Sequence, residues 1–253
     1  MTAELLHTNK EKFMKHFNPE ALIKLGADKH QEYINASPFP HIVIDNLFDV
    51  TTLKSITSEF PKMQEKMKGK ANNKTLNKLS FRQPEKLELF EPLTKEFCLE
   101  LNSLEFCKFL ENLTGIENIQ ADPYLEGGGP HEIKKGGFLK MHIDFNIHPI
   151  TEQDRRINVL IYLNDIWEEE YKGHLDLWDT EMGDLKKSIS PIINRVVIFN
   201  TTENSWHGHP DPLNCPETSS RKSLAFYYYT DPAPGQVRSG HSTIYKKRHD
   251  SDF

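Results

Sequence analysis

The spacing of apolar positions changes near residue 120, from helical periods to short alternating runs. Before that point, residues 8–34 read as helical with polar faces, and the run FPHIVIDNLF reads as a short strand that leads into a helix. Asp49 is placed to cap this helix, because its carboxylate can accept hydrogen bonds from the free N–H groups of the first turn. The expected apolar face of the helix consists of Leu53, Ile56 and Phe60.

Two more helices are expected in the first half of the chain. One begins near Pro92, and the other follows Ser103 and ends near Gly115, in keeping with the residues favoured at helix starts and ends. Their expected apolar positions are Leu93, Phe97 and Leu101 in the first helix and Leu104, Cys107 and Leu110 in the second.

A lysine- and asparagine-rich run over residues 62–78 is polar and is broken by Gly69. Its charge pattern favours a solvated surface loop, and a lid over a site is the alternative. Binding residues are often carried on loops of a rigid scaffold. We therefore expect residues 62–78 and the loop over residues 124–137 to influence specificity.

From about residue 120 the chain consists of short aromatic or β-branched runs separated by polar turns, namely FLKMHIDF, INVLIYLND, GHLDLWD, NRVVIFNT and KSLAFYYYT. This pattern predicts an antiparallel sandwich or barrel. We expect one domain over residues 1–253 that is mainly β with an N-terminal helical layer (α+β). The helical layer and first strand would span residues 1–118, the β core 119–232, and a tail 233–253 that ends in the disordered segment YKKRHDSDF.

Composition narrows the functional classes. The chain has 253 residues, 37% of them hydrophobic, and a formal net charge of -6, which weighs against a nucleic-acid partner. No apolar run reaches the length of a membrane span, and the charged N-terminus does not resemble a signal peptide. The three cysteines are widely spaced, so we expect reduced thiols, with Cys215 at the surface, and a cytoplasmic protein.

The candidate chemistry begins with His142 and Asp144 in the run LKMHIDFN. Residues two apart in a strand point the same way, and burial of an unpaired carboxylate is costly, so a nearby cation is expected. His207 follows another strand about 60 residues downstream. Two imidazoles and one carboxylate form the facial triad of non-haem Fe(II) oxygenases, although the same ligands could bind zinc.

Arg221 opens the run RKSLAFYYYT and would provide a fixed cation in the barrel. Its planar guanidinium could bind the distal carboxylate of 2-oxoglutarate through two hydrogen bonds. Tyr162, on the same strand face as Asn158 and Leu160, could add a hydroxyl to that site. The alternative for Tyr162 is a core aromatic residue with a satisfied hydroxyl.

Six segments together resemble the 2-oxoglutarate- and Fe(II)-dependent oxygenases in order and spacing, and most closely their prolyl 4-hydroxylase-like branch. They are HID, INVLIYLND, GHLDLW, NRVVIFN, SWHGHP and RKSLAFYYYT, within residues 120–232. The resemblance implies a double-stranded β-helix, or jelly roll. It implies His142, Asp144 and His207 as metal ligands and Arg221, Tyr162, Asn158 and His131 as cofactor-binding residues. His131 would replace a tyrosine common in the family, or be structural.

The resemblance also implies an activity. Fe(II), 2-oxoglutarate and O2 would support hydroxylation of an unactivated C–H bond, with ascorbate as a stimulant. The expected substrate is proline or another free amino acid, or a prolyl residue in a peptide. A carboxylate at Asp144 implies hydroxylation, because related halogenases have a small residue there.

Other polar residues near these motifs have weaker claims. Trp206, Arg155 and Glu126 are candidates for substrate binding, with packing or a solvated surface as the alternative. His209 is expected in a turn, with an indirect or structural role. His174 and Asp176 repeat the His-x-Asp spacing, but they follow the YLN strand, where the family does not place its ligands.

Two other classes of protein remain open at this point. A zinc hydrolase could use the same triad with a bound water, but it would leave Arg221 and Tyr162 without a role. A non-catalytic cupin-like binding module could retain the barrel, but it would not need all three ligands. An oxygenase that acts on nucleic-acid bases is disfavoured by the acidic charge.

Overall fold

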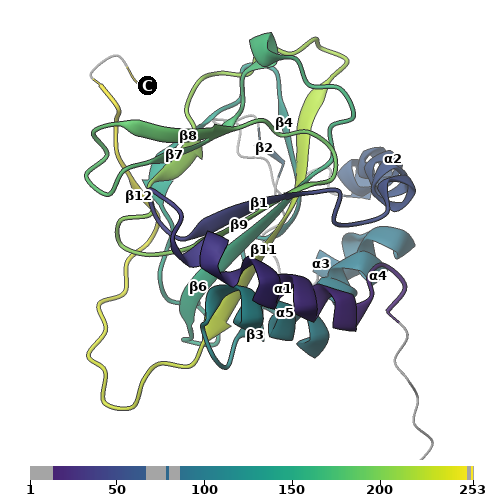
Figure 1. Cartoon of the computed structure of the whole chain (residues 1–253). Coiled ribbons are helices and arrows are strands. Elements are labelled where there is room, and N and C mark those ends of the chain that lie inside the picture. The colour runs from purple at the N-terminus through teal and green to yellow at the C-terminus, as the bar shows by residue number, and fades with distance from the viewer. Residues whose placement is uncertain (1–13, 67–77, 80–85, 250–251, 253) are drawn as a thin grey trace, which may run out of the picture.

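Two antiparallel β-sheets form the body of the protein, and helices lie against the larger one (Figure 1). The structure, a computed structural model, describes residues 14–66, 78–79, 86–249 and 252. Over these residues it has the predicted architecture, an N-terminal helical layer on the double-stranded β-helix of the resemblance.

The helices all precede the β core except for one short 3-10 turn. They are α1 (Pro19–Ile34), α2 (Val50–Lys66), α3 (Lys86–Leu89), α4 (Pro92–Leu101), α5 (Leu104–Thr114) and the 3-10 helix η1 (Glu169–Tyr171). The predicted capping residues are confirmed: Asp49 accepts a hydrogen bond from the N–H of Thr52, and Ser103 accepts one from Phe106. Gly115 ends α5 with a positive φ of 73°, which glycine adopts without strain.

The larger sheet has the strand order β1-β9-β6-β11-β4-β2, with β3 also paired to β11. Its strands are β1 (His41–Asp45), β2 (Lys78–Leu79), β3 (Gln120–Ala121), β4 (Gly129–Lys134), β6 (Asp154–Tyr162), β9 (Arg195–Asn200) and β11 (Ser220–Thr230). The smaller sheet has the order β12-β5-β10-β7-β8. Its strands are β5 (Leu139–Ile143), β7 (Leu175–Trp178), β8 (Leu185–Ile189), β10 (His207–His209) and β12 (Ile244–Tyr245).

Alternation along β6 shows how the sequence separates the core from the site. Ile157, Val159 and Ile161 are fully buried in the cluster that joins the larger sheet to the helices. Leu160 and Tyr162 pack in a separate apolar cluster that also contains residues of β7 and β8 in the smaller sheet. One face of this strand therefore stabilises the helical layer, and the other faces the interior between the sheets.

One predicted apolar position of the helical layer is wrong. Leu104, the first residue of α5, is 75% exposed, whereas Phe106 and Phe109 of the same helix are fully buried. The buried face is set by how α5 packs on α1 and on Tyr228 of β11, whose ring stacks on Phe106. The spacing of apolar residues along α5 does not by itself show which side of the helix faces α1 and β11.

Three predictions about segments need correction. Residues 62–66 belong to helix α2, and the rest of the expected loop up to residue 77 lies outside the described residues. Residues 129–134 of the other expected loop form strand β4. Cys215 is buried, not at the surface, because it packs against Ile133 and Leu213.

The described part of the C-terminal segment is also more ordered than its polar sequence predicted. After β11 it runs outward and returns to the smaller sheet, as the yellow trace in Figure 1 shows. There β12 pairs with β5, so that Tyr245 lies opposite His142. Arg248 then forms ion pairs with Asp211 and Asp252. Backbone pairing and ion pairs hold a segment that has little apolar content of its own.

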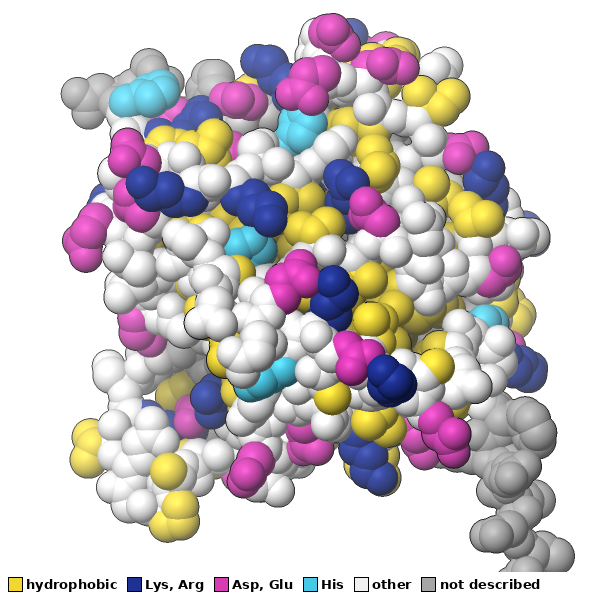
Figure 2. Space-filling view, viewed as in Figure 1, with side chains coloured by type: hydrophobic (Ala, Val, Ile, Leu, Met, Phe, Trp, Pro, Cys, Tyr) yellow, Lys and Arg dark blue, Asp and Glu magenta, His cyan; other side chains and the backbone are white. Residues whose placement is uncertain are grey.

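The surface of the view in Figure 2 carries basic and acidic side chains interspersed with one another. Among the described residues, none of the helices has the length and apolar character needed to cross a membrane.

The packing of α5 gives a stability prediction with an internal control. Phe106→Ala should lower the free energy of unfolding by about 3–5 kcal/mol, because it removes a fully buried ring. Leu104→Ala, two residues away on the exposed side, should change it by no more than about 0.5 kcal/mol. Urea denaturation followed by circular dichroism measures both. Equal losses for the two variants would contradict the described packing.

Candidate active site

Two histidines meet because of the register between strands β5 and β10. His207 lies directly opposite His142, and their ring centroids are 4.3 Å apart. Gly208 allows this close pairing, since a Cβ there would lie 2.8 Å from the carbonyl oxygen of Lys140. Asp144 follows β5, on the same side as His142. Sequence positions far apart thus converge at one end of the smaller sheet.

Hydrogen bonds fix the tautomer of each imidazole. Nδ1 of His142 lies 2.8 Å from the carbonyl oxygen of Lys140, and Nδ1 of His207 lies 2.9 Å from that of Ser205. A carbonyl oxygen can only accept, so each Nδ1 must carry the proton. In the neutral rings both Nε2 atoms then present lone pairs.

These lone pairs face a carboxylate. Nε2 of His142 lies 3.6 Å from Oδ1 of Asp144, and Nε2 of His207 lies 3.5 Å from its Oδ2. Burial and the neighbouring His142 lower the pKa of His207 to about 4, so His207 is neutral near pH 7. Burial opposes ionisation of Asp144, but the positive charge of Arg155 holds its pKa well below the usual range.

The arrangement fits a divalent cation. Three buried or nearly buried ligand atoms lie within 4.8 Å of one another, and all are electron donors. A cation between them removes the repulsion between the carboxylate and the two lone pairs, which is the role expected of a facial triad. His142, Asp144 and His207 therefore lie together as the sequence predicted.

Asn158 and Arg155 hold the carboxylate. Nδ2 of Asn158 lies 2.7 Å from Oδ2 of Asp144, and Nη2 of Arg155 lies 3.0 Å from the same oxygen. The guanidinium of Arg155 also stacks on Tyr227, with its central carbon 3.6 Å from the ring centroid. Asn158 was predicted to bind the cofactor and Arg155 to bind the substrate. In the structure both side chains contact the carboxylate of Asp144.

A β-bulge explains why Arg155 points inward. Tyr228 of β11 pairs with Ile157 of β6, but the adjacent Tyr229 pairs with Arg155. One extra residue, Arg156, therefore interrupts the alternation of β6. As a result Arg155 and Asn158, three residues apart, reach the same carboxylate, that of Asp144.

Arg221 lies on the inner face of the larger sheet. Its Nε donates to the carbonyl oxygen of Gly173 at 2.7 Å, and its Nη2 donates to the hydroxyl of Tyr162 at 3.1 Å. A Cβ at Gly173 would collide with Leu213, so glycine is needed for this close approach. Tyr162 is fully buried behind Arg221, and its hydroxyl orients the guanidinium. The two predicted partners are thus brought together.

The cavity over the triad has a volume of about 480 Å³. It is lined by both histidines of the triad and Asp144, and also by Arg221. A metal and a dicarboxylate cofactor can therefore share one cavity, with a cation at each end for the two charged groups of the cofactor.

The remaining sequence candidates divide into two groups. His131 and Glu126 line this cavity, and the ring of His131 contacts the carbonyl oxygen of Gly127 at 2.9 Å. His209 also lines it, because residues 207–209 form an extended strand and not the predicted turn. Trp206 does not line it: its indole packs against Met141, Ile143 and Met182, since it precedes His207 and points to the other face of the sheet.

His174 and Asp176, which repeat the spacing of the triad, are separate from it. His174 lies 3.2 Å from Glu169, and Asp176 accepts a hydrogen bond from Ser188 at 2.7 Å. The carboxylate and imidazole face the outside of β7, away from the buried Leu175 and Leu177.

Sequence reasoning missed several lining residues. Tyr227 lies in the predicted strand, and its alternation with Ala225 and Ser223 could have placed it in the cavity. His241 and Tyr245 come from the segment expected to be a tail, and their polar surroundings gave no signal. The ring of Tyr245 lies 5.6 Å from that of His142.

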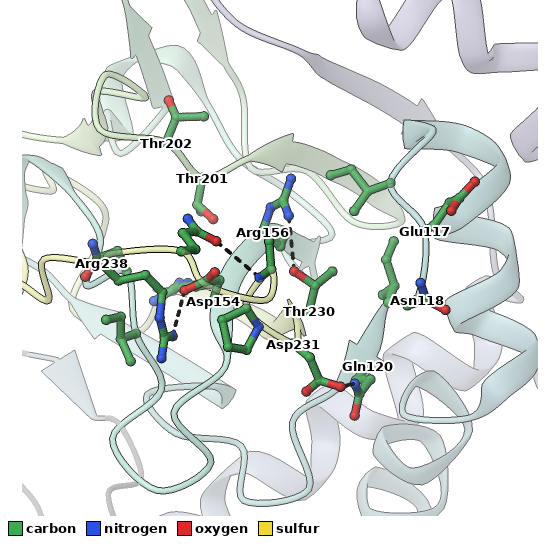
Figure 3. Close-up of a pocket in the computed structure, with 18 of the residues that line it drawn as sticks. Glu117, Asn118, Gln120, Asp154, Arg156, Thr201, Thr202, Thr230, Asp231 and Arg238 are labelled. Atoms are coloured by element: carbon green, nitrogen blue, oxygen red, sulfur yellow. Dashed lines mark hydrogen bonds and ion pairs between the residues drawn. The ribbon is translucent and has the colours of Figure 1, made fainter.

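An open groove adjoins the cavity, with a volume of about 1530 Å³ (Figure 3). Asp144, Phe145, Ile147, Arg155 and His241 line both spaces, so the groove leads to the triad. Its walls come from α5 and the residues that follow it, from the start of β6 and from the segment after β11.

Comparison with known proteins agrees with this geometry. Residues 128–229 match the model of the 2OG-Fe(II) oxygenase superfamily. The matched residues are those of the β core, and the triad and the cavity fit that superfamily. Its members use Fe(II) and 2-oxoglutarate, and His142, Asp144 and His207 form the facial triad for the iron.

Three individual proteins are similar to parts of the chain. Prolyl 3-hydroxylase OGFOD1 of Mus musculus is 31% identical over 86 residues, which cover 32% of this chain and only 15% of that protein. A prolyl 4-hydroxylase structure from Phytophthora capsici has a TM-score of 0.59 at 19% identity and covers 91% of this chain and 72% of that one. A Pseudomonas putida prolyl-4-hydroxylase has a TM-score of 0.53 at 14% identity, over 85% and 100%. At these identities the two structures show a shared fold.

The triad predicts how metal binding responds to mutation. His207→Ala should weaken Mn(II) binding by at least roughly 100-fold, more than loss of an outer partner causes, because it removes a direct ligand. His174→Ala should leave the affinity unchanged, since His174 precedes β7 and lies beside Glu169, apart from the triad. Isothermal titration with Mn(II) measures both. A loss of affinity in the His174 variant alone would contradict the assignment of the triad.

Arg221 predicts a separate effect on the cofactor. Arg221→Lys should weaken 2-oxoglutarate binding to the Mn(II)-loaded protein by roughly 10-fold or more, because lysine cannot keep the two-sided contact with a carboxylate. Tyr162→Phe should have a smaller effect, since it removes one hydrogen bond. Mn(II) affinity should stay unchanged in both. Normal cofactor affinity in the Arg221 variant would show that the distal carboxylate binds elsewhere.

Proposed function

We propose that this protein is an Fe(II)- and 2-oxoglutarate-dependent dioxygenase that hydroxylates a prolyl residue within a polypeptide. The observation that carries the proposal is the pairing of a buried His-x-Asp…His triad with a buried arginine in one cavity. The triad alone would also suit zinc, but a hydrolase has no use for Arg221 held by Tyr162 and Gly173.

Each residue of the cavity has a part in this reaction. Fe(II) with 2-oxoglutarate and O2 supplies the oxidising power, at the cost of converting 2-oxoglutarate to succinate and carbon dioxide. Arg221, oriented by Tyr162, would hold the distal carboxylate of the cofactor. Arg155 and Asn158 would keep Asp144 ionised and oriented, and the buried walls would exclude water from the reacting groups.

The prolyl substrate is supported by the known proteins that share the fold and by a short similar segment in a prolyl 3-hydroxylase. The polypeptide context is supported by the open groove. Its volume of about 1530 Å³ exceeds the roughly 300–1,000 Å³ of a typical small-molecule pocket. A free amino acid would fill only the inner cavity beside the cofactor.

Succinate formation tests the proposal directly. The wild-type protein with Fe(II), O2 and ascorbate should convert 2-oxoglutarate to succinate and should add one oxygen atom to proline-containing peptides. His142→Ala should abolish both activities, because it removes a metal ligand. Arg221→Ala should retain them only at a much higher concentration of 2-oxoglutarate. Mass spectrometry of cofactor and peptide gives both readouts.

The absence of succinate, with no 2-oxoglutarate binding by the metal-loaded protein, would contradict the proposed function and favour a zinc hydrolase. Peptide hydrolysis that depends on zinc and on His207 would support that alternative directly.

A further inference from the structure

We propose that Arg156 is a substrate-binding residue that recognises an acidic side chain of the polypeptide, close in sequence to the hydroxylated residue. This inference rests on the proposed function and specifies which polypeptides the groove accepts. It depends on the position of Arg156 in the groove, on its hydrogen-bond partners and on the charges around it.

The β-bulge in β6 gives adjacent arginines different tasks. Arg155 is turned inward to Asp144, and the extra residue of the bulge, Arg156, lines the groove but not the inner cavity. Figure 3 shows its side chain extending into the middle of the groove, between Thr201 and Thr202 on one side and Glu117 and Asn118 on the other. The bulge thus places the guanidinium of Arg156 in the groove that leads to the metal site.

Arg156 is half-buried and underused as a hydrogen-bond donor. Its Nη1 donates to the hydroxyl of Thr230 at 3.1 Å. Its backbone carbonyl accepts from the N–H of Thr201 at 2.9 Å, which fixes the main chain. Among the described residues, no carboxylate forms an ion pair with it. A guanidinium has five N–H donors, so most of its capacity remains for a ligand.

The other charged groups near the centre of the groove already have partners. Asp154 forms an ion pair with Arg238 at 3.0 Å. Asp231 accepts hydrogen bonds from Gln120 and Gln153 at 3.0 and 2.9 Å. Glu203 lies 3.0 Å from His241. These contacts, several of them drawn in Figure 3, hold the walls of the groove together, whereas Arg156 lines the groove without an ion pair among the described residues.

The charges at the rim are different in kind. Lys108 and Glu117 are exposed to solvent and opposite in sign, so neither supplies the groove with a fixed preference. A half-buried arginine is a stronger anchor, because its planar fork is partly desolvated and can hold a carboxylate through two hydrogen bonds. An acidic side chain is therefore the complementary group.

The position of Arg156 next to Arg155 limits how far the acidic residue can lie from the hydroxylated residue along the substrate. Arg156 follows Arg155, which touches the metal ligand Asp144, and consecutive Cα atoms are about 3.8 Å apart. An extended polypeptide covers about 3.3–3.6 Å per residue. With the reach of an arginine side chain added, the acidic residue should lie within roughly two to four positions of the hydroxylated one.

The test uses a library of blocked peptides with proline at the centre and randomised flanking positions, together with free proline. Wild-type protein loaded with Fe(II) and 2-oxoglutarate should hydroxylate members with Asp or Glu at one fixed offset preferentially. For a matched peptide pair, Glu against Gln at that offset, KM should rise roughly 10-fold with Gln while kcat stays similar. Sequencing of the oxidised peptides by mass spectrometry identifies the offset.

Three variants assign the preference to one side chain. Arg156→Gln should abolish the preference between Glu and Gln peptides. Lys108→Gln, which removes the exposed cation at the rim, should retain the preference. Arg156→Glu should prefer a Lys peptide at the same offset. The thermal midpoint of each variant checks folding.

The outcomes separate this inference from the proposed function. Hydroxylation of prolyl peptides with no acidic preference, or a preference retained in Arg156→Gln, would overturn the role of Arg156 alone. Hydroxylation of free proline but of no peptide would overturn it together with the polypeptide substrate. Failure to oxidise any prolyl compound would overturn both proposals. An acidic preference lost in Arg156→Gln and reversed in Arg156→Glu would establish the contact.

Discussion

The structure depends on one electrostatic constraint, the placement of the Asp144 carboxylate opposite two imidazole nitrogen lone pairs. Without a cation this arrangement is repulsive, because His142 and His207 each use Nδ1–H on a backbone carbonyl. Arg155 and Asn158 offset part of the cost from one side. A metal cation between the three groups would remove the remaining repulsion, so the three side chains are arranged as metal ligands.

The two sheets divide the work around that centre. The smaller sheet supplies the triad through the pairing of β5 with β10, and the larger sheet supplies Arg221 and Tyr162 from neighbouring strands. Helices α1 and α5 pack on the far side of the larger sheet and bury its outer face. The helical layer thus stabilises a wall of the active site without touching the reacting groups. The fold explains how distant residues converge, and the side chains explain what they can bind.

The sequence allowed the β core, the helix caps and the triad to be predicted, because strand alternation and capping are local rules. It did not allow the inward turn of Arg155 to be predicted, since simple alternation places Arg156 on the same face as Asn158 and only the bulge reverses this. It also failed for Trp206, whose position next to His207 suggested the cavity although neighbours in a strand face opposite sides. The pairing of β12 with β5 had no local signal, because backbone hydrogen bonds hold a polar segment in place.

An anaerobic crystal structure with Mn(II) and 2-oxoglutarate would show the metal centre and the cofactor site directly. We expect the metal on Nε2 of His142, Nε2 of His207 and one oxygen of Asp144, with the distal carboxylate of 2-oxoglutarate on Arg221. A metal bound elsewhere, for example at His174, would contradict the metal centre. A cofactor whose distal carboxylate avoids Arg221 would contradict the cofactor site.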